Sequence, residues 1–244
     1  MTIRKTCLIT GASAGIGAAC ALRAAKDYDL LLTYRSDQSG AESTAKAARA
    51  LGAQVHIVQA DVAEPDDIAK TYQAFDQHFE TLDLLINNAG IVAPVGTLQD
   101  MDHARLRRMF DVNVIGTMLM AKGALPRMGA GSTIINMGSA AARLGSGGSF
   151  IDYAASKAAI DTFTKGLSDE VAPRGIRVLA IRPGIIVTDI HAKAHAAERV
   201  EQITPSIPLR RAGTADEVAA LTLWLASDAA GYITGTSIDI TGGR

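Results

Sequence analysis

The segment YAASK, Tyr153–Lys157, places a phenol and an ammonium group four positions apart, a spacing that brings two side chains to one face of a helix. A tyrosine with its ordinary pKa of about 10 exchanges protons slowly near neutral pH, and a neighbouring cation lowers that pKa. The pair is therefore a candidate acid/base catalyst. An amphipathic helix with an exposed lysine would produce the same spacing, so the rest of the chain has to decide between these interpretations.

Two further polar residues lie in apolar surroundings that would place them near such a site. Ser139 follows the apolar segment STIINM, so its hydroxyl is expected at the end of a strand, where it could bind a substrate oxygen and stabilise developing charge. Asn113 lies in FDVNVIG, an otherwise apolar helical segment in which a buried amide needs hydrogen-bond partners. Ser139 could instead cap a helix, and Asn113 could make a purely structural polar contact.

A glycine-rich turn near the N-terminus predicts a nucleotide site. The segment TGASAGIG, Thr10–Gly17, ends an apolar strand and begins a helix. Glycine lets the backbone turn sharply and approach a pyrophosphate, while the helix N-terminus presents free N–H groups. The spacing departs from the strict G-x-G-x-x-G pattern, and glycines at such a turn could also serve packing alone. The residues that we expect to contact the nucleotide here are Gly11, Ser13, Gly15, Ile16 and Gly17.

The end of the second strand indicates which nucleotide is bound. The segment LLLTYRSD places Tyr34, Arg35 and Ser36 where NAD-binding proteins carry an acidic residue for the ribose. A guanidinium can form charge-assisted bonds to a ribose phosphate, which favours NADP over NAD without excluding NAD. Asp37 could instead pair with Arg35 in a solvated loop. Further residues at later strand ends, expected to line the same site or to cap helices and close turns, are Asp61, Val62, Asn88, Ala89 and Gly90.

The arrangement of apolar segments predicts the fold. Apolar runs and helical patterns alternate almost from end to end of the 244 residues, as in repeated βαβ units. We expect an α/β fold over residues 1–244: a single-domain, Rossmann-type, doubly wound parallel sheet of about seven strands with helices on both faces. Two segments interrupt the pattern. The loop GSGGS, Gly145–Ser149, is expected to be mobile and beside the site, and residues at about 184–210 are expected to form a substrate flap.

The composition limits the classes of partner. The chain is 48% hydrophobic and 20% charged with a formal net charge of −1, which gives no general attraction to nucleic acid or membrane. The first apolar stretch is too short for a signal peptide and no run approaches membrane-spanning length, so we expect a cytoplasmic protein. Cys7 and Cys20 lie in apolar stretches and are expected to be buried free thiols. His191 and His195 have metal-binding spacing, but no third ligand accompanies them and we expect no metal.

Taken together, the motifs resemble those of the classical short-chain dehydrogenase/reductase family along essentially the whole chain. The resemblance rests on TGASAGIG, the NNAG after the fourth strand, the Asn of DVNV, the Ser of NMGSAA, YAASK, and the RPG turn followed by Thr188. The YRS end of the second strand and the closing ITGTSIDITGG are similar to the branch that contains ketoacyl reductases and sugar dehydrogenases. The resemblance also implies a homotetramer, because relatives commonly assemble through two long helices and the C-terminal strand region.

The resemblance assigns roles to individual residues. It implies that Tyr153 is the acid/base, that Lys157 lowers its pKa and binds the nicotinamide ribose, and that Asn113 holds a water linking the lysine to solvent. Arg143 and Phe150 flank the GSGGS loop and could touch substrate, or could be solvated and packed respectively. The resemblance makes the catalytic residues Asn113, Ser139, Tyr153 and Lys157, and it adds to the cofactor contacts Tyr153, Lys157, Pro183, Gly184, Ile186 and Thr188, the last at the nicotinamide carboxamide.

The sequence therefore predicts an NADP-preferring oxidoreductase that interconverts a carbonyl and a secondary alcohol of a small molecule, with Tyr153 exchanging the proton. The alternative is a non-catalytic NADP-binding regulator or scaffold on the same fold, against which the four catalytic residues together argue. A nucleotide-sugar epimerase or dehydratase would share the Tyr/Lys pair but would need a larger C-terminal substrate domain than the residues after Lys157 can build. The loop and flap residues are mostly small or aliphatic, which indicates a modest, fairly apolar substrate pocket.

Overall fold

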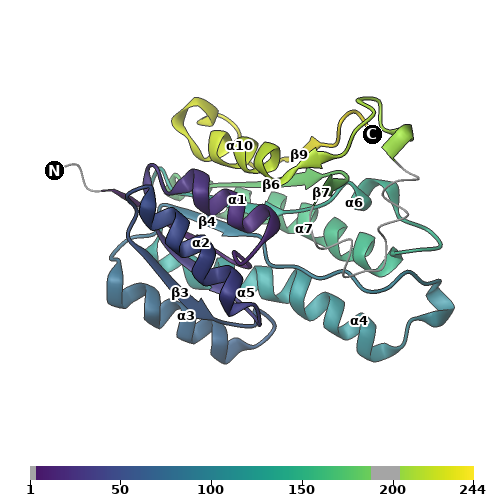
Figure 1. The fold of residues 1–244 in the computed structure, drawn as a ribbon, viewed down its shortest axis with the longest axis horizontal. Coiled ribbons are helices and arrows are strands. Elements are labelled where there is room, and N and C mark those ends of the chain that lie inside the picture. The colour runs from purple at the N-terminus through teal and green to yellow at the C-terminus, as the bar shows by residue number, and fades with distance from the viewer. Residues whose placement is uncertain (1–3, 188–203) are drawn as a thin grey trace.

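Seven parallel strands form one sheet in the part of the chain that the computed structural model describes, residues 4–187 and 204–244. Helices cover both faces of the sheet (Figure 1), which confirms the predicted doubly wound architecture. In spatial order the strands are β3 (Val55–Gln59), β2 (Tyr28–Tyr34), β1 (Lys5–Ile9), β4 (Leu84–Asn87), β5 (Thr133–Met137), β6 (Arg177–Pro183) and β9 (Ser237–Ile240).

The helices follow the predicted alternation with the strands. They are α1 (Gly15–Ala24), α2 (Gln38–Ala50), α3 (Pro65–His78), α4 (His103–Phe110), α5 (Thr117–Ala124), α6 (Ala141–Leu144), α7 (Ile151–Val171) and α10 (Ala215–Ala226). A separate two-stranded parallel pair joins β7 (Ile186–Val187) to β8 (Gly213–Thr214). Thr188, His191, His195 and most of the expected flap lie outside the described residues.

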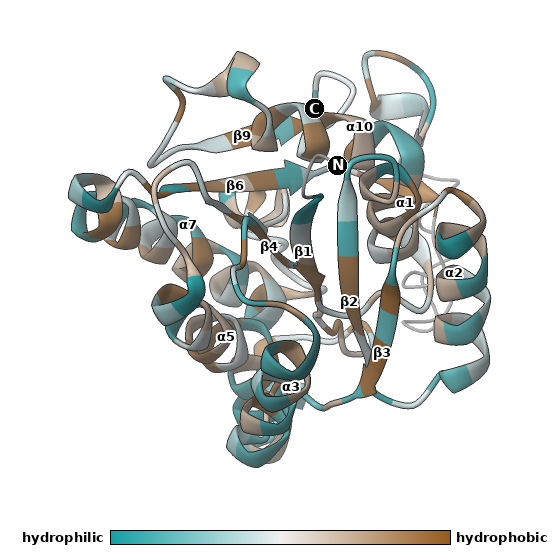
Figure 2. Cartoon of the chain, turned by 90° about the vertical axis from the view of Figure 1, so that its left-hand side faces the viewer, coloured by the Kyte–Doolittle hydropathy of each residue, from teal (hydrophilic) through white to brown (hydrophobic). Residues whose placement is uncertain are grey.

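The sheet is buried on both faces, which explains the continuous apolar runs of its strands. Cys7 and Ile9 of β1 belong to one buried cluster and Leu8 to the other, because alternate side chains of a strand point to opposite faces. Helices α1, α2 and α10 cover the first face, and α3, α5 and α7 cover the second (Figure 2). Cys7 and Cys20 are fully buried free thiols, as predicted.

The helical segment expected around Asn113 is interrupted at this residue. Helix α4 begins at His103, where the Asp102 carboxylate accepts a hydrogen bond from the backbone N–H of Arg105 at 2.8 Å. A π-helical turn, Asp111–Gly116, then separates α4 from α5. Turns of this kind insert an extra residue and occur frequently at functional sites. The hydrophobic pattern alone did not reveal this break.

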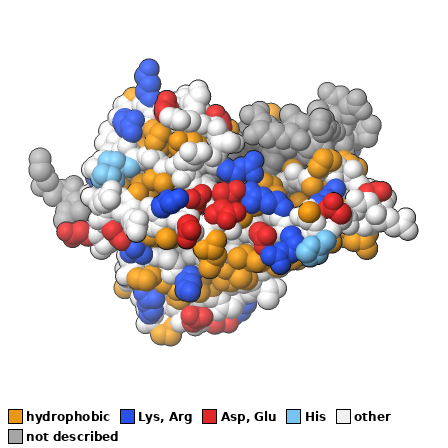
Figure 3. Space-filling view, turned by 90° about the horizontal axis from the view of Figure 1, so that it is seen from below, with side chains coloured by type: hydrophobic (Ala, Val, Ile, Leu, Met, Phe, Trp, Pro, Cys, Tyr) orange, Lys and Arg blue, Asp and Glu red, His pale blue; other side chains and the backbone are white. Residues whose placement is uncertain are grey.

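The surface carries charges of both signs. Ion pairs such as Arg127–Asp76 and Arg108–Asp61 form at 2.5 Å. On the face seen in Figure 3, Lys and Arg side chains lie among Asp and Glu side chains. That face therefore presents no extended field of one sign, in keeping with the net charge of −1. Among the helices of residues 4–187 and 204–244, none combines the length and the apolar character needed to span a bilayer.

Candidate active site

A cleft of about 410 Å³ opens at the carboxyl ends of β1, β2, β3 and β4. Ligands of open parallel α/β sheets bind at this edge, so the cleft lies where the sequence placed the nucleotide. The predicted residues that line it are Gly11, Ser13, Gly15, Ile16, Arg35, Ser36, Asp61, Val62, Asn88, Ala89 and Gly90. The other residues along its walls are Ala14, Thr33, Asp37, Ala60, Ile91, Val92, Arg108 and Val112.

The glycine-rich turn forms the floor of the cleft. Gly11 and Gly15 have φ angles of +66° and +57°, a region in which a side chain is strained. A Cβ at Gly11 would lie 3.0 Å from the Cα of Ala89. The Asn88 side-chain amide donates to the carbonyl oxygens of Thr10 and Gly11, both at 2.9 Å, and so fastens β4 to the turn. The backbone approach that a pyrophosphate requires is therefore present.

Gly17 serves packing rather than the cleft wall. A Cβ at this position would collide with the carbonyl oxygen of Gly11 and would come within 2.6 Å of the Asn88 side-chain nitrogen. Gly17 is buried and does not line the cleft. The first turn of α1 can approach the loop only because Gly17 has no side chain. Gly17 therefore acts on the cleft indirectly, by allowing this close packing.

Arg35 and Ser36 are exposed at the end of β2 and line the cleft, as expected for a phosphate-binding position. Tyr34 does not line it, because its side chain is buried with 7% of its surface exposed. Asp37 caps α2 by accepting a hydrogen bond from the backbone N–H of Gly40 at 2.9 Å, and in the described residues no ion pair joins it to Arg35. The Arg35 guanidinium is thus available at the rim.

Asp61 is held in the cleft wall by a cation that the sequence analysis missed. The Arg108 guanidinium lies 2.5 Å from the Asp61 carboxylate, and the other carboxylate oxygen accepts from the backbone N–H of Ala63 at 3.0 Å. Arg108 and Val112 both line the cleft and are four positions apart, a spacing that places them on one side of the helix. Arg108 lies five positions before Asn113 in the same helical segment, and this proximity in sequence is the signal that could have identified Arg108 and Val112 as residues of the cleft wall.

Lys157 is buried where the cleft meets β5. Its side-chain ammonium donates to the carbonyl oxygen of Met137 at 2.6 Å and lies 5.8 Å from the centroid of the Tyr153 ring. A Cβ at Gly90, which lines the cleft, would lie 3.5 Å from the Lys157 Nζ and 3.3 Å from the Asn113 Oδ1. The nucleotide cleft and the predicted catalytic residues therefore form one continuous site.

Asn113 joins three segments around this site. Its side-chain oxygen accepts from the backbone N–H of Ile91 at 2.8 Å, while its nitrogen donates to the Ile91 carbonyl at 2.9 Å and to the Ser156 hydroxyl at 3.1 Å. Ser156 in turn donates to the carbonyl oxygen of Tyr153 at 2.7 Å. The fully buried amide thus makes the structural contacts that were one of its two predicted roles.

Ser139 interacts both with the start of α6 and with Tyr153. Its hydroxyl oxygen accepts from the backbone N–H of Ala141, the first residue of α6, at 3.1 Å, whereas the N-cap of that helix is Ala140. Burial raises the pKa of the Tyr153 phenol, and a hydrogen bond with Ser139 opposes that shift. The sequence analysis expected Lys157 to lower this pKa. In this structure Ser139 is the group that lowers it, and burial outweighs the effect.

Lys157 carries the opposite perturbation. Burial lowers its pKa from 10.5 to about 8, and the Asp161 carboxylate, one turn further along α7, opposes the change. Removing a cation from water disfavours its charged form, which is why burial acts in this direction. The phenol is therefore protonated at neutral pH, while the ammonium group changes its charge close to the physiological range.

The carboxyl end of β6 packs against the same site. The Pro183 carbonyl accepts from the backbone N–H of Ala140 at 3.0 Å, and the Gly184 N–H donates to the Ile240 carbonyl at 2.9 Å. A Cβ at Gly184 would lie 2.9 Å from the Cα of Thr241, so glycine permits this close approach. Ile186 is buried in the β7–β8 pair. These predicted cofactor residues thus build the turn rather than the cleft wall described above.

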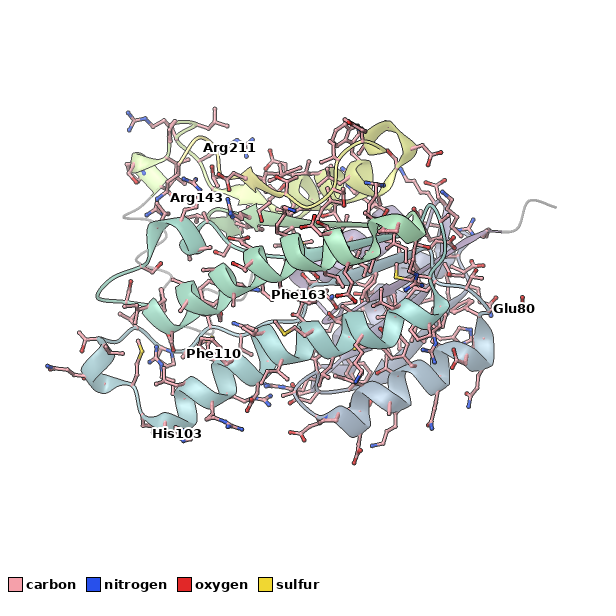
Figure 4. All side chains as sticks on the ribbon, turned by 180° about the vertical axis from the view of Figure 1, so that it is seen from behind. Glu80, His103, Phe110, Arg143, Phe163 and Arg211 are labelled. Carbon is pink, nitrogen blue, oxygen red and sulfur yellow. The ribbon has the colours of Figure 1, made fainter. Side chains whose placement is uncertain are left out.

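The residues expected to flank the substrate lie on either side of the GSGGS loop. Arg143, in α6, pairs with Asp239 at 2.9 Å and donates to the backbone oxygen of Arg244 at 3.1 Å. Its guanidinium is therefore bound to the C-terminal segment, beside which it lies in Figure 4. Phe150 is partly buried at the start of α7.

The parallel sheet with a nucleotide-sized cleft and a Tyr/Ser/Lys cluster at its end defines a dinucleotide-binding α/β enzyme. A family model described as enoyl-(acyl carrier protein) reductase matches residues 11–244. A short-chain dehydrogenase from Burkholderia cenocepacia, solved in complex with NADP, matches with a TM-score of 0.92 at 34% identity, over 98% of this chain and 97% of that one. The chain belongs to the short-chain dehydrogenase/reductase family and is an NAD(P)-dependent oxidoreductase.

Two curated relatives match over nearly their full length. An uncharacterized oxidoreductase of Escherichia coli, YgfF, is 42% identical over 243 residues, which cover 97% of this chain and 98% of the relative. The 3-oxoacyl-[acyl-carrier-protein] reductase FabG of Staphylococcus aureus is 35% identical over 246 residues, and the match covers 100% of this chain and 99% of FabG. The similarity therefore extends from the glycine-rich turn through the Tyr/Ser/Lys cluster to the C-terminal strand.

Proposed function

We propose that this protein is an NADP-preferring oxidoreductase that interconverts a carbonyl group and a secondary alcohol, with Tyr153 as the acid/base. The observation that carries the proposal is the cluster at the end of the cleft, in which the Ser139 hydroxyl acts on the Tyr153 phenol and the buried Lys157 ammonium lies 5.8 Å from the centroid of the Tyr153 ring. Such a cluster can exchange one proton with a substrate oxygen.

The three side chains divide the proton chemistry. Tyr153, protonated at neutral pH, donates its proton to the carbonyl oxygen during reduction and takes it back during oxidation. The Ser139 hydroxyl donates a hydrogen bond to the same oxygen and stabilises the charge that develops there. The Lys157 ammonium favours the phenolate that reduction leaves behind. When bound, a nicotinamide cofactor supplies or accepts the hydride.

The cleft has the features that such a cofactor needs. Gly11 and Gly15 line the cleft with positive φ angles, and α1 begins at Gly15, so the N-terminal end of this helix lies at the cleft. Arg35 and Ser36 stand exposed at its rim, where a guanidinium and a hydroxyl can bind the ribose phosphate of NADP. The solved relative from Burkholderia cenocepacia is in complex with NADP, which agrees with this preference.

The test is NADPH and NADH consumption by the purified protein with a panel of ketones, ketoacyl thioesters, diketones and sugar-derived carbonyls. We expect turnover with NADPH on at least one carbonyl, and Tyr153→Phe should lose roughly a hundredfold or more of it. NADPH fluorescence should show that this variant still binds the cofactor, because the change removes one hydroxyl at the catalytic end of the site.

Tyr232→Phe is the matched control, because Tyr232 is fully exposed and lies outside the cleft. This variant should keep wild-type turnover. Full activity in Tyr153→Phe would refute the acid/base role. NADPH binding with no turnover on any carbonyl of the panel would count against the enzyme proposed here and would favour a non-catalytic NADP-binding protein on the same fold.

A further inference from the structure

A half-buried ion pair lies next to the turn that holds Ser139 and Lys157. Asp161 of α7 accepts from the Nε of Arg182, in β6, at 2.9 Å, and a second guanidinium nitrogen lies 2.9 Å from the same oxygen. The other carboxylate oxygen accepts from the Ser237 hydroxyl at 2.8 Å. The two charged side chains are 15% and 19% exposed, so solvent screens their fields only weakly.

This pair touches the turn that carries the catalytic groups. Gly138 stands between Met137, whose carbonyl binds the Lys157 ammonium, and Ser139. A Cβ at Gly138 would lie 3.6 Å from the Asp161 carboxylate and 3.4 Å from the Arg182 side chain. The pair therefore packs against the backbone that holds Ser139 and Lys157 in place.

The ion pair continues to the substrate side of the molecule. Arg182 lies 3.5 Å from the carboxylate of Asp239, which in turn is 2.9 Å from Arg143 of α6. The chain of two cations and two carboxylates thus connects α7, β6, β9 and α6. Exposure of the side chains rises along it from 15% at Asp161 to 42% at Arg143, so the inner pair has the stronger field.

The charges around Lys157 leave Asp161 as its anionic neighbour. Asp152, also in α7, is paired with Arg105 of α4 at 2.8 Å and lies five positions before Lys157, whereas Asp161 follows Lys157 by four positions, one helical turn. Burial lowers the pKa of Lys157 and Asp161 raises it. On α7 itself the charged or titratable groups near this lysine are Tyr153, Asp152 and Asp161. The elements packed against α7 add His103, Arg105, Arg107 and Arg108 on α4, Asp111 in the π-helical turn, Arg143 on α6, and Arg177 and Arg182 on β6, with Asp239 of β9 beside Arg182.

We propose that Asp161 and Arg182 act as an electrostatic positioning pair: Asp161 keeps the buried Lys157 protonated, and Arg182 orients Asp161 and limits its effect. Neither residue touches the reacting atoms, so both act through Lys157. The inference rests on the proposed function for its consequence in turnover, while the protonation of Lys157 is a property of the chain itself. The pair thus sets the pH range over which the Tyr153/Lys157 cluster works.

Two charge-removing substitutions should move the pH profile in opposite directions. Asp161→Asn removes a negative charge and leaves Arg182 with Asp239 as its remaining carboxylate neighbour, so the alkaline limb of kcat/KM should move to lower pH. Arg182→Gln removes a positive charge and should move it to higher pH, each by roughly half a unit to one unit. The signs hold whether the limb reports Lys157 or Tyr153, because a nearby charge shifts the pKa of both groups in the same direction.

The same shifts should be visible without turnover. NMR of protein labelled with ¹³C at the lysine ε carbons follows the protonation of each Nζ, and Lys157→Met identifies the signal of Lys157. Its midpoint should fall in Asp161→Asn and rise in Arg182→Gln. If the wild type turns over no carbonyl, the proposed function fails while this titration still tests the ion pair.

Three further variants complete the test. Asp169→Asn is the matched control, since Asp169 lies on the same helix and pairs with Lys165 but is 66% exposed; it should shift nothing. Arg182→Lys keeps the charge and should keep the wild-type midpoint. The double variant Asp161→Asn/Arg182→Gln remains informative if a single variant does not fold: its midpoint should lie between those of the wild type and Asp161→Asn. Equal shifts of both single variants, or none, would overturn the proposal.

Discussion

The nucleotide cleft and the catalytic cluster at its end use their residues in different ways. The cleft is lined largely by backbone, by small side chains and by the exposed rim residues Arg35 and Ser36. In the cluster Lys157 is 5% exposed, and Ser139 and Tyr153 are half-buried; Asn113, beside it, is fully enclosed. In the cleft a ligand is recognised by shape and by charge in solvent, whereas in the cluster burial itself sets protonation. Substitutions in the two regions should therefore differ in kind as well as in size.

The largest effect on stability is expected at Lys157, because its burial is opposed to its charge. Its pKa is about 8 in the folded protein and 10.5 in the absence of burial. Between these values the unfolded chain holds the proton and the folded one releases it. The unfolded state then binds more protons, so stability rises with pH across this window, by about 3 kcal/mol in total.

Lys157→Met removes this titration. The free energy of unfolding of the wild type, measured relative to the variant by urea denaturation, should increase by that amount between pH 8 and 10.5. Lys165→Met is the control, because Lys165 lies on the same helix and is 61% exposed, and its difference from the wild type should be nearly independent of pH in this range. A flat difference for Lys157→Met as well would show that burial does not perturb this lysine.

The second effect should come from the amide that ties the cleft to the cluster. Asn113→Ala would leave the backbone N–H and carbonyl of Ile91 without the partners that now lie at 2.8 and 2.9 Å. Burying such groups unpaired costs about 1 to 3 kcal/mol of the free energy of unfolding. Gln54→Ala, which removes an exposed amide bonded to His56, should stay within about 0.5 kcal/mol. If the two variants lost comparable free energy of unfolding, the hydrogen bonds between Asn113 and Ile91 would not contribute more than an exposed amide does.

The sequence predicted those parts of the site that depend on local backbone chemistry. Glycines between a strand and a helix have few physical explanations, and Gly11 and Gly15 adopt the positive φ angles that such a turn requires. The same reasoning did not distinguish Gly17, which packs against the loop, or Tyr34, whose side chain is buried. The side chains of consecutive residues at a strand end can point to opposite faces of the sheet. Assigning a whole segment to the cofactor site therefore included residues that line the cleft and residues that do not.

Contacts between distant segments were beyond the sequence. Arg108 reaches Asp61 across 47 positions, and Arg182 reaches Asp161 across 21; nothing in the spacing of either residue indicates its partner. The π-helical turn at Asp111–Gly116 was missed for a related reason. Its geometry depends on close packing between distant segments, since a Cβ at Gly116 would lie 2.6 Å from the Val62 carbonyl.

The smallest effect should appear at the rim of the cleft. Arg35 is exposed and lies where the ribose phosphate of NADP is expected, so its charge is screened and its removal costs binding rather than folding. Arg35→Ser should weaken NADPH binding roughly tenfold while leaving NADH binding and the melting temperature nearly unchanged. Fluorescence titration with each cofactor measures the two affinities.

Arg107→Ser is the matched control for that change. Arg107 is 67% exposed on α4 and lies outside the cleft wall. Its substitution therefore removes an equal charge from the surface without removing the phosphate contact. If both variants lowered NADPH affinity equally, the effect would belong to the overall field of the protein, which reaches only about 10 Å in 0.1 M salt. A loss of affinity that occurs only in Arg35→Ser, and only for NADPH, would assign the NADP preference to the Arg35 guanidinium. It would also separate cofactor recognition at the rim of the cleft from the proton chemistry of the Tyr/Ser/Lys cluster.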